Sequence, residues 1–306
     1  MIKYILRRLL ASIIVMFCVV VVAFTLLRVA TGNPALMLLP DGATDEEIAM
    51  MEESLGLNKP YIVQFWDYFS GLFKGDFGTS LTYKLPCMEV ILGRFPRTLE
   101  LALAGAIVAT LLAIPIGIIA GVHQGTGIDL GAMGFALIFQ SMSTIWLAVL
   151  LVLIFSVELN WLPSMGTSNF KSIILPALTI GLPMAGETTR MARSGIIDVL
   201  KEDYITATYA RGISRSAVYT KYALKNALIP VITLLGMSTA GYLGGAVVCE
   251  TIFTWPGIGG LVKMALAQRD YPLVQTLLLC FSGMIAIMNL IIDIINSYVD
   301  RRIVLK

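Results

Sequence analysis

The sequence predicts an all-α integral membrane protein with six transmembrane helices and a helical extracytoplasmic region after the first of them. Two observations support this prediction. Of the 306 residues, 57% are hydrophobic and only 14% are charged, and the mean hydropathy is +0.83. A single soluble core of this length could not hide so much apolar surface from water. The apolar residues are also gathered into long uncharged runs, and about 20 such residues in a helix cross the roughly 30 Å of bilayer hydrocarbon.

Each predicted span is a stretch without Asp, Glu, Lys or Arg. The long runs cover residues 9–27, 101–122, 130–157, 226–249 and 271–292. A sixth run, residues 172–186, reaches spanning length only if Glu187 and part of residues 188–192 are included. We therefore expect six crossings, the fourth of which contains an acidic residue.

The charges between the runs predict the orientation. Lys3, Arg7 and Arg8 precede the first run, which is longer than the apolar part of a secretory signal and is not followed by an A-x-A cleavage site. We interpret this run as a retained membrane anchor. If the N-terminus is cytoplasmic, the inner segments are 1–8, 123–129, 190–225 and the tail from 299, which together hold most of the Lys and Arg residues. The positive-inside rule then places both termini in the cytoplasm, in a multi-pass protein of the cell membrane.

The chain accordingly divides into four parts. These are the tail and first transmembrane helix over 1–30, an extracytoplasmic helical loop region over 31–98, a five-helix core over 99–298 with a cytoplasmic loop at 193–225, and a cytoplasmic tail over 299–306.

The extracytoplasmic region contains helix signals of its own. Thr44 and Glu47 have the spacing of a capping box, and Gly56 suits a left-handed helix stop. A second, aromatic amphipathic stretch covers residues 62–73 and leads into the turn-rich GDFGTS at 75–80. These two helices are either a packing surface for neighbouring helices or a docking surface for an external partner, and the sequence leaves both open.

The usual equipment of an enzyme is missing from the sequence. His123 stands alone at the end of an apolar run, no H-E-x-x-H pattern occurs, and no Gly-Lys dipeptide offers a Walker A loop for ATP. We therefore expect no catalysis and no cofactor in this chain, so that any ATP is bound elsewhere. The near-balance of 22 basic and 20 acidic residues also argues against nucleic-acid binding.

The cysteines do not predict a metal or redox site. Cys18, Cys87, Cys249 and Cys280 lack C-x-x-C spacing and lie far from any histidine group. We expect them to be small apolar residues at packed positions. A disulfide between Cys87 and Cys249 on the outer side stays possible.

Three acidic residues lie in or beside the apolar runs, where an unpaired charge is costly. Glu250 and Asp293 stand at the ends of their runs, so we expect them in the headgroup region. Glu187 stands inside the fourth span, one turn before Arg190. Either an ion pair between these two residues neutralises it, or it faces a water-filled pathway.

The fifth run is rich in small residues, which allow helix backbones to approach closely. Gly241 and Gly245 have the G-x-x-x-G spacing of packed membrane helices. Together with Glu187 they are our candidates for a translocation pathway.

The inner loop 193–225 is the most informative stretch. Amphipathic helical pieces around 196–209 end at Arg211, whose charge complements a helix C-terminus, and Gly212, which suits the left-handed stop. A basic helix follows over 215–225. A short helix of this kind is a suitable mechanical lever, although a basic loop can also simply be solvated or touch anionic lipid.

This loop resembles a known family. DYITATYARG at 203–212 and KYALKNALIP at 221–230 are similar to the coupling loop of ATP-binding-cassette (ABC) importer permeases, within the dipeptide, oligopeptide and nickel group and its first subunit type. The resemblance continues over most of the chain, through YILRRLL, LGLNKPYIVQFWDY, GDFGTS, RTLELAL, LPALTIGLP, ETIFTWPGIGGLV and RDYPLVQ.

The family's E-A-A motif is present in altered form. Ala207 and Gly212 match it, whereas Thr206 stands where Glu is expected and Thr208 replaces Ala. Residues 222–225 replace I-x-L-P, with Pro230 five residues further on. Peptide-type members commonly depart from the motif in this way, so a role assigned to the missing glutamate does not transfer.

The resemblance implies a type I ABC importer permease fold in the lipid bilayer. It further implies a homologous second permease, two cytoplasmic ATPase subunits and an extracytoplasmic substrate-binding lipoprotein as partners, with peptides as cargo. The residues that it implies for ATPase coupling are Asp203, Tyr204, Ala207, Arg211 and Gly212. Import of nickel, a metallophore or glutathione is the alternative within this architecture. An autonomous channel or ion-coupled carrier is the alternative outside it, for which Gln140, Asn289 and Glu187 are the only polar candidates.

Overall fold

The computed structural model describes residues 2–30, 39, 43–54, 56–167, 169–244 and 246–299, and this part of the chain is almost entirely helical. Its only extended pairing is one antiparallel bridge between Thr79 and Pro86. The predicted all-α class is therefore confirmed.

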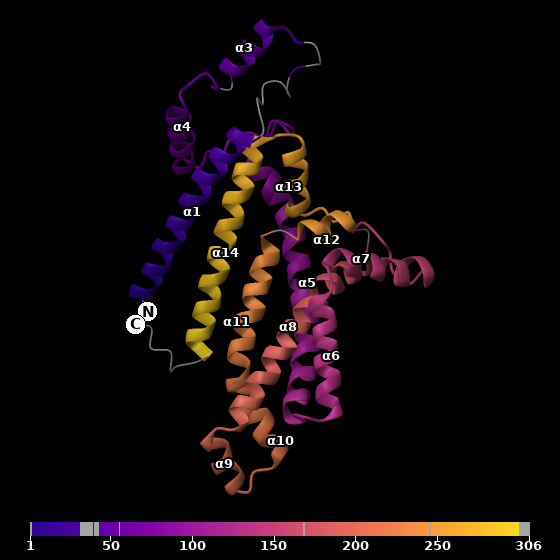
Figure 1. Ribbon diagram of the computed structural model, residues 1–306. Helices are drawn as coiled ribbons and strands as arrows, with labels where there is room; N and C mark the ends of the chain where they lie inside the picture. Colours follow the sequence, from indigo (N-terminus) through magenta and orange to yellow (C-terminus); the bar gives the residue numbers. More distant parts are fainter. Residues whose placement is uncertain are drawn as a thin grey trace.

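Long helices form an elongated bundle (Figure 1). The central pair is α5 (Cys87–Val122) and α8 (Ile174–Leu200), with α6 (Gly127–Ser141) packed on one side and α11 (Leu224–Leu243) on the other. Beyond α11 lies α14 (Tyr271–Val299), and α1 (Ile2–Ala30) lies along α14. The short helices α9 (Asp203–Ala210) and α10 (Arg215–Ala217) project from one end, called here the α9 end, and α13 (Ile258–Ala267) lies at the opposite end.

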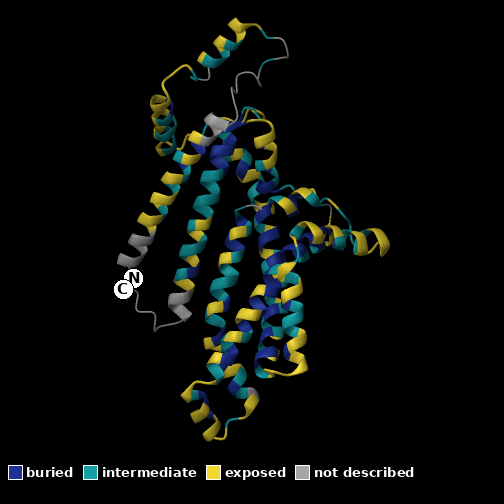
Figure 2. Cartoon of the chain, in the orientation of Figure 1, coloured by how far each residue is buried: buried dark blue, intermediate teal, exposed yellow. Residues whose placement is uncertain are grey.

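Small residues hold α5 and α8 together. A Cβ atom on Gly117 would lie 2.6 Å from the Cβ of Ala192, and one on Gly105 would lie 2.8 Å from the Ile180 side chain. The two backbones therefore approach as closely as glycine allows. Buried side chains concentrate along this contact (Figure 2).

The run at 130–157, which the sequence predicted as one span, is divided into two helices by a sharp bend. α6 ends at Ser141, and α7 (Thr144–Leu151) continues as the π-helical turn η1 (Val152–Glu158) at 103° to α6. Met142 and Ser143 both have an extended backbone, with ψ 134, which interrupts the helical hydrogen bonds. A run without charges does not reveal such a break, because serine and methionine are both tolerated in an apolar helix.

The run at 226–249 also needs correction at its end. α11 stops at Leu243, and Cys249 belongs to the separate helix α12 (Val247–Ile252). At the other end, α11 extends backward through the π-helical turn η3 (Val218–Ala223), so the basic helix expected over 215–225 leads directly into the span.

Three helices in the described residues are long and apolar enough to cross a membrane, or up to four if the bent pair is one span. They are Cys87–Val122, Val218–Leu243 and Tyr271–Ile295, and the bent pair is Gly127–Ser141 with Thr144–Glu158. In α1 the described apolar segment is Leu9–Thr25. The count of six crossings stays a prediction. Large apolar side chains are exposed on the outside of the bundle, for example Leu10 on α1 and Leu111 on α5, as expected for a surface that faces lipid.

The region between α1 and α5 has the two helices that the sequence predicted. α3 (Asp45–Ser54) begins with the capping box, since the Thr44 N–H donates to Glu47 Oε2 at 2.8 Å and the Glu47 N–H donates to Thr44 Oγ1 at 3.3 Å. Gly56 has φ +66, as the predicted left-handed stop requires.

The second of these helices, α4 (Tyr61–Phe73), packs against α1 through aromatic rings. Phe65 lies 5.4 Å from Phe24 and Phe69 lies 5.5 Å from Phe17, measured between ring centroids. One face of α4 is therefore a packing surface. The Trp66 and Phe73 side chains of α4 remain exposed. The alternative, that these two helices are a docking surface for an external partner, therefore also stays open.

Candidate functional site

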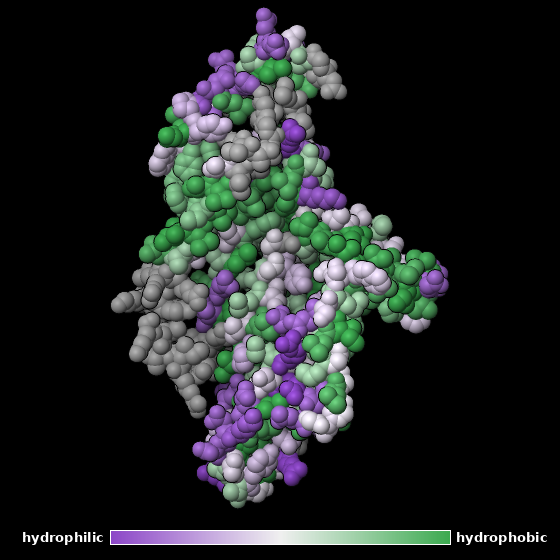
Figure 3. Space-filling view, viewed as in Figure 1, coloured by the Kyte–Doolittle hydropathy of each residue, from purple (hydrophilic) through white to green (hydrophobic). Residues whose placement is uncertain are grey.

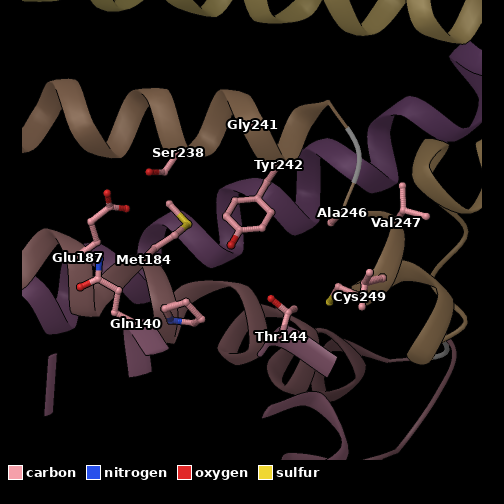
Figure 4. Close-up of a pocket in the computed structure, with 12 residues that line it drawn as sticks. Gln140, Thr144, Met184, Glu187, Ser238, Gly241, Tyr242, Ala246, Val247 and Cys249 are labelled. Carbon is pink, nitrogen blue, oxygen red and sulfur yellow. The ribbon is translucent and has the colours of Figure 1, made fainter. Parts of the chain in front are cut away.

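A cavity of about 490 Å³ opens between α8, α11, α12 and the bend between α6 and α7 (Figure 4). Apolar side chains and glycine make up part of its wall. Its polar lining residues are Gln140, Thr144, Glu187, Ser238 and Tyr242. The bend that the sequence did not reveal therefore helps to form the cavity, because Gln140 precedes it and Thr144 follows it.

Glu187 opens onto this cavity and is exposed. The ion pair between Glu187 and Arg190, one of our two interpretations, is wrong: the Arg190 Nη1 atom instead donates to Gln140 Oε1 at 2.6 Å, and the described residues contain no ion pair at Glu187. The other interpretation, contact with a water-filled pathway, stays a prediction.

Gly241 lines the same cavity, but not for the reason that its spacing suggested. A Cβ atom added to Gly241 would meet nothing within 4 Å, so this glycine does not pack against another helix in the part of the chain that the structure describes. Close approach by α11 occurs instead at Gly236, where a Cβ atom would lie 2.5 Å from the Ile292 side chain. Gly245 lies outside the described residues.

The predicted coupling residues lie together on and after α9, at one tip of the molecule (Figure 1). Asp203, Ala207, Arg211 and Gly212 are all exposed. Tyr204 differs, since it is half-buried and its hydroxyl accepts a hydrogen bond from Asn226 Nδ2 at 2.8 Å. Tyr204 therefore fixes α9 to the start of α11, whereas the other four residues are free to meet a partner.

Gly212 ends α9 as predicted. Its φ is +75, and its N–H donates to the Tyr209 carbonyl oxygen at 2.9 Å. A Cβ atom on Gly212 would meet nothing within 4 Å, so the requirement for glycine comes from the backbone conformation alone.

Beneath α9 lies a small apolar cluster. Ile205, Val218 and Ala223 are fully buried in it. Hydrophilic side chains cover the outside of this end of the molecule (Figure 3). The contact that holds α9 to the bundle is therefore limited to a few side chains.

Sequence reasoning missed an ion pair between α6 and α8. Arg193 forms two hydrogen bonds with Asp129, from Nε to Oδ1 at 2.5 Å and from Nη2 to Oδ2 at 2.7 Å, and the Gly125 N–H adds a third at 2.9 Å. Asp129 is only 4% exposed. The available signal was an acidic residue in the first turn of a helix, in a short inner segment without Lys or Arg.

Glu250 is buried inside the protein, and our expectation that it lies at the depth of the headgroups stays a prediction. It is 1% exposed, and its carboxylate accepts hydrogen bonds from Thr98 Oγ1 and from the Gly260 N–H, both at 2.8 Å. The Gly257 backbone lies so close that a Cβ atom there would be 2.1 Å from Glu250 Oε1. The segment ETIFTWPGIGG therefore folds around its own glutamate.

A second buried carboxylate fixes the GDFGTS turn. Asp270, with no exposed surface, accepts hydrogen bonds from Ser80 Oγ at 2.5 Å and from the Thr82 N–H at 3.1 Å. It also accepts one from the Leu273 N–H at 3.3 Å, at the start of α14. Two motifs that are distant in sequence thus meet at the end opposite α9.

The cysteines are free thiols, so the possible disulfide is ruled out. Cys87 and Cys249 are both buried, in separate apolar clusters. Among the described residues, no group of three or more His, Cys, Asp or Glu side chains is placed to hold a metal ion.

Comparison with known proteins assigns the family. Residues 113–305 match the model of the binding-protein-dependent transport system inner membrane component, and residues 1–102 match the corresponding N-terminal model. The chain is 38% identical to the dipeptide transport system permease protein DppB of Alkalihalophilus pseudofirmus, over 99% of both chains. It is 36% identical to the glutathione transport system permease protein GsiC of Escherichia coli (strain K12), again over 99% of both.

Solved structures share the fold. The chain is similar to one in the inward-facing MetNI methionine ABC transporter, with a TM-score of 0.60 and 17% identity over 70% of this chain and 98% of that chain. An amino acid ABC transporter gives a TM-score of 0.52 at 13% identity, over 71% and 95% of the two chains. With the family matches, these likenesses identify the chain as a member of the binding-protein-dependent transport system inner membrane components, a multi-pass permease subunit of an ABC importer.

Proposed function

We propose that this permease pairs with a homologous second permease to form the translocation pathway of a peptide importer. Two ATPase subunits bind and hydrolyse ATP, and a substrate-binding lipoprotein delivers cargo from outside, so this chain needs neither catalysis nor a cofactor of its own. One observation carries the proposal: the helix that lines the cavity with Glu187 also leads into the exposed helix α9.

The α9 end faces the cytoplasm in this proposal. Both termini are cytoplasmic, and the region between α1 and α5 lies on the outer side. Asp203, Ala207, Arg211 and Gly212 contact an ATPase subunit, while Tyr204 holds α9 in place from within.

The mechanism is a shift between inward-open and outward-open states. Closure of the ATPase dimer moves α9. Helix α8 carries that displacement to the cavity wall, where α8 contributes Glu187 and α11 contributes Gly241. ATP at one end and the loaded binding protein at the other each act through the difference in their affinity for the two states. Gly245 stays a candidate residue of the same pathway.

The relative named for dipeptide transport matches over the whole chain and supports peptides as the cargo. The relatives named for glutathione transport match equally well and keep glutathione as the second candidate.

A substitution at Gly212 tests the coupling. In the importer reconstituted with its ATPase, partner permease and binding protein, Gly212→Val should leave membrane insertion intact and reduce cargo-stimulated ATP hydrolysis to the basal rate. A β-branched residue disfavours positive φ, so α9 can no longer end correctly. The matched control is Gly212→Asn, which tolerates this conformation and should retain most of the stimulation.

Coupled turnover by Gly212→Val equal to that of the Asn variant would contradict the proposed role of α9. Solute movement by the purified chain alone in liposomes would favour an autonomous channel or carrier instead.

A further inference from the structure

Among the described residues that line the cavity beside α8, Glu187 is the one acidic side chain and none is basic. Gln140, Thr144, Ser238 and Tyr242 supply the other polar groups of the wall. Figure 4 shows the Glu187 carboxylate on the side of the cavity where Ser238 lies, with Tyr242 and Thr144 further along the wall.

The two basic residues that follow Glu187 along α8 do not line the cavity. Arg190, one turn further on, donates Nη1 to Oε1 of the lining residue Gln140 at 2.6 Å, so its positive charge lies next to the cavity wall. Arg193, another turn on, forms two hydrogen bonds with Asp129. The other helices around the cavity contribute no charged side chain to the described lining. Glu187 is therefore the one acidic or basic side chain that lines the described cavity itself.

Such a carboxylate has a predictable effect on solutes. Within the depth of a bilayer, a charge costs several kcal/mol unless water or a counter-charge is present. The open cavity admits water, and a cationic solute supplies the counter-charge. Two unit charges a few ångströms apart interact by about 1 kcal/mol in bulk water and about 4 kcal/mol near a protein surface. The site therefore attracts cationic groups and repels anionic ones by the same amount.

We propose that Glu187 makes this cavity a transient binding site for the positively charged group of the cargo, so that the permease itself favours neutral or cationic peptides over anionic ones. The inference rests on the proposed import of peptides. It also separates the two cargo candidates, because a dipeptide with neutral side chains carries no net charge at neutral pH, whereas glutathione has two carboxylates and one ammonium group.

The charge of the cavity can be measured without knowledge of the cargo. In the reconstituted importer, Ser238→Cys places a thiol on the cavity wall, and mass spectrometry of that peptide follows its modification by a cationic and an anionic methanethiosulfonate of similar size. We expect the cationic reagent to be favoured. Glu187→Gln removes an attraction of roughly 1 kcal/mol for the cationic reagent and a repulsion of the same size for the anionic one, so it should reduce the ratio of the two rates by about 30-fold. Glu187→Lys should reverse the preference.

The matched control is Glu158→Gln, which removes an exposed carboxylate that does not line the cavity and should leave the ratio unchanged. An unchanged ratio in Glu187→Gln would overturn the proposal.

Transport tests whether the cargo uses this charge. The probes are lysylalanine, dialanine and glutathione, with net charges of +1, 0 and −1 from their ordinary ionisation. Glu187→Gln should lower the turnover rate for lysylalanine relative to glutathione without changing the affinity of the separate binding protein for either.

Equal preferences in wild type and Glu187→Gln would overturn the inference even if the reagent ratio changes. Failure of the wild-type importer to move either dipeptide would instead count against peptide import, while the reagent ratio would still report the charge of the cavity.

Discussion

The two ends of this permease are held by different kinds of contact. At the end opposite α9, two fully buried carboxylates, Glu250 and Asp270, each accept hydrogen bonds both from a segment that is distant in sequence and from one nearby. At the α9 end, the coupling helix rests on a small apolar cluster around Ile205 and on two hydrogen bonds of the Tyr204 hydroxyl, one from Asn226 Nδ2 at 2.8 Å and one to the Tyr222 carbonyl oxygen at 3.5 Å.

This difference indicates which end of the molecule is rigid and which is held weakly. A buried carboxylate with all its hydrogen bonds made is costly to disturb, because any movement leaves polar groups unpaired. A short exposed helix on a few apolar contacts is held weakly and gains stability from a partner. The structure of the end opposite α9 is therefore fixed by the permease itself, whereas the α9 end gains stability from the ATPase subunit that we propose binds there.

The largest effect should come from crowding the buried glutamate. Gly257→Ala would bring a Cβ atom to 2.1 Å from Glu250 Oε1, and we expect a loss of about 3 kcal/mol of stability, because the carboxylate must abandon its hydrogen bonds. Thermal unfolding in detergent measures it. Gly260→Ala is the matched control, since its Cβ atom would lie at 3.9 Å and should be tolerated. Equal stability of the two variants would show that this end is not rigid.

A smaller and more local effect is expected at the other end. Ile205→Ala removes most of a fully buried side chain beneath α9 and should cost about 2 kcal/mol. Because only a few side chains join α9 to the rest of the bundle, its amides should exchange faster with solvent while the unfolding temperature of the bundle changes little. Thr206→Ala alters an exposed residue of the same helix and should leave exchange unchanged. A large fall in the unfolding temperature of Ile205→Ala would mean that α9 is as firmly fixed as the opposite end.

The smallest effect concerns the capping box of α3. Hydrogen bonds from the backbone N–H and then the hydroxyl of Thr44 hold the pKa of the Glu47 carboxyl below its ordinary value. The stabilisation is therefore complete above the ordinary glutamate pKa and is lost as the pH falls through the lower, folded-state pKa. Thr44→Ala removes the hydroxyl but keeps the backbone N–H, so it should increase amide exchange in the first turn of α3 at neutral pH by a few-fold and weaken this pH dependence. Retention of the same pH dependence in the variant would contradict the assignment.

Local signals in the sequence predicted local structure well. The capping box at Thr44 and the left-handed stops at Gly56 and Gly212 depend on neighbouring residues only, and each is present as predicted. The bend after Ser141 and the end of α11 at Leu243 were missed because apolar composition is the same in a straight helix and in a broken one.

The candidate site was predicted in part. Glu187 and Gly241 both line the cavity, but the sequence could not tell that Arg190 contacts α6 instead of Glu187. Asp129 with Arg193, and Glu250 with Thr98, are pairs separated by 64 and 152 positions. Spacing rules for one helix do not reach that far, so only the packed helices bring these partners together.

The continuity of α8 affects how often the transporter consumes ATP without moving cargo. From Met184 to Leu200 no proline interrupts it, and it ends two residues before α9 begins. In a futile cycle, ATP is consumed while nothing crosses the membrane. Such a cycle then requires α8 to bend. Pro183, on the cavity wall, is the point where a missing backbone hydrogen bond makes bending easiest. How tightly ATP hydrolysis is coupled to cargo transport therefore depends on the stiffness of about five turns of α8.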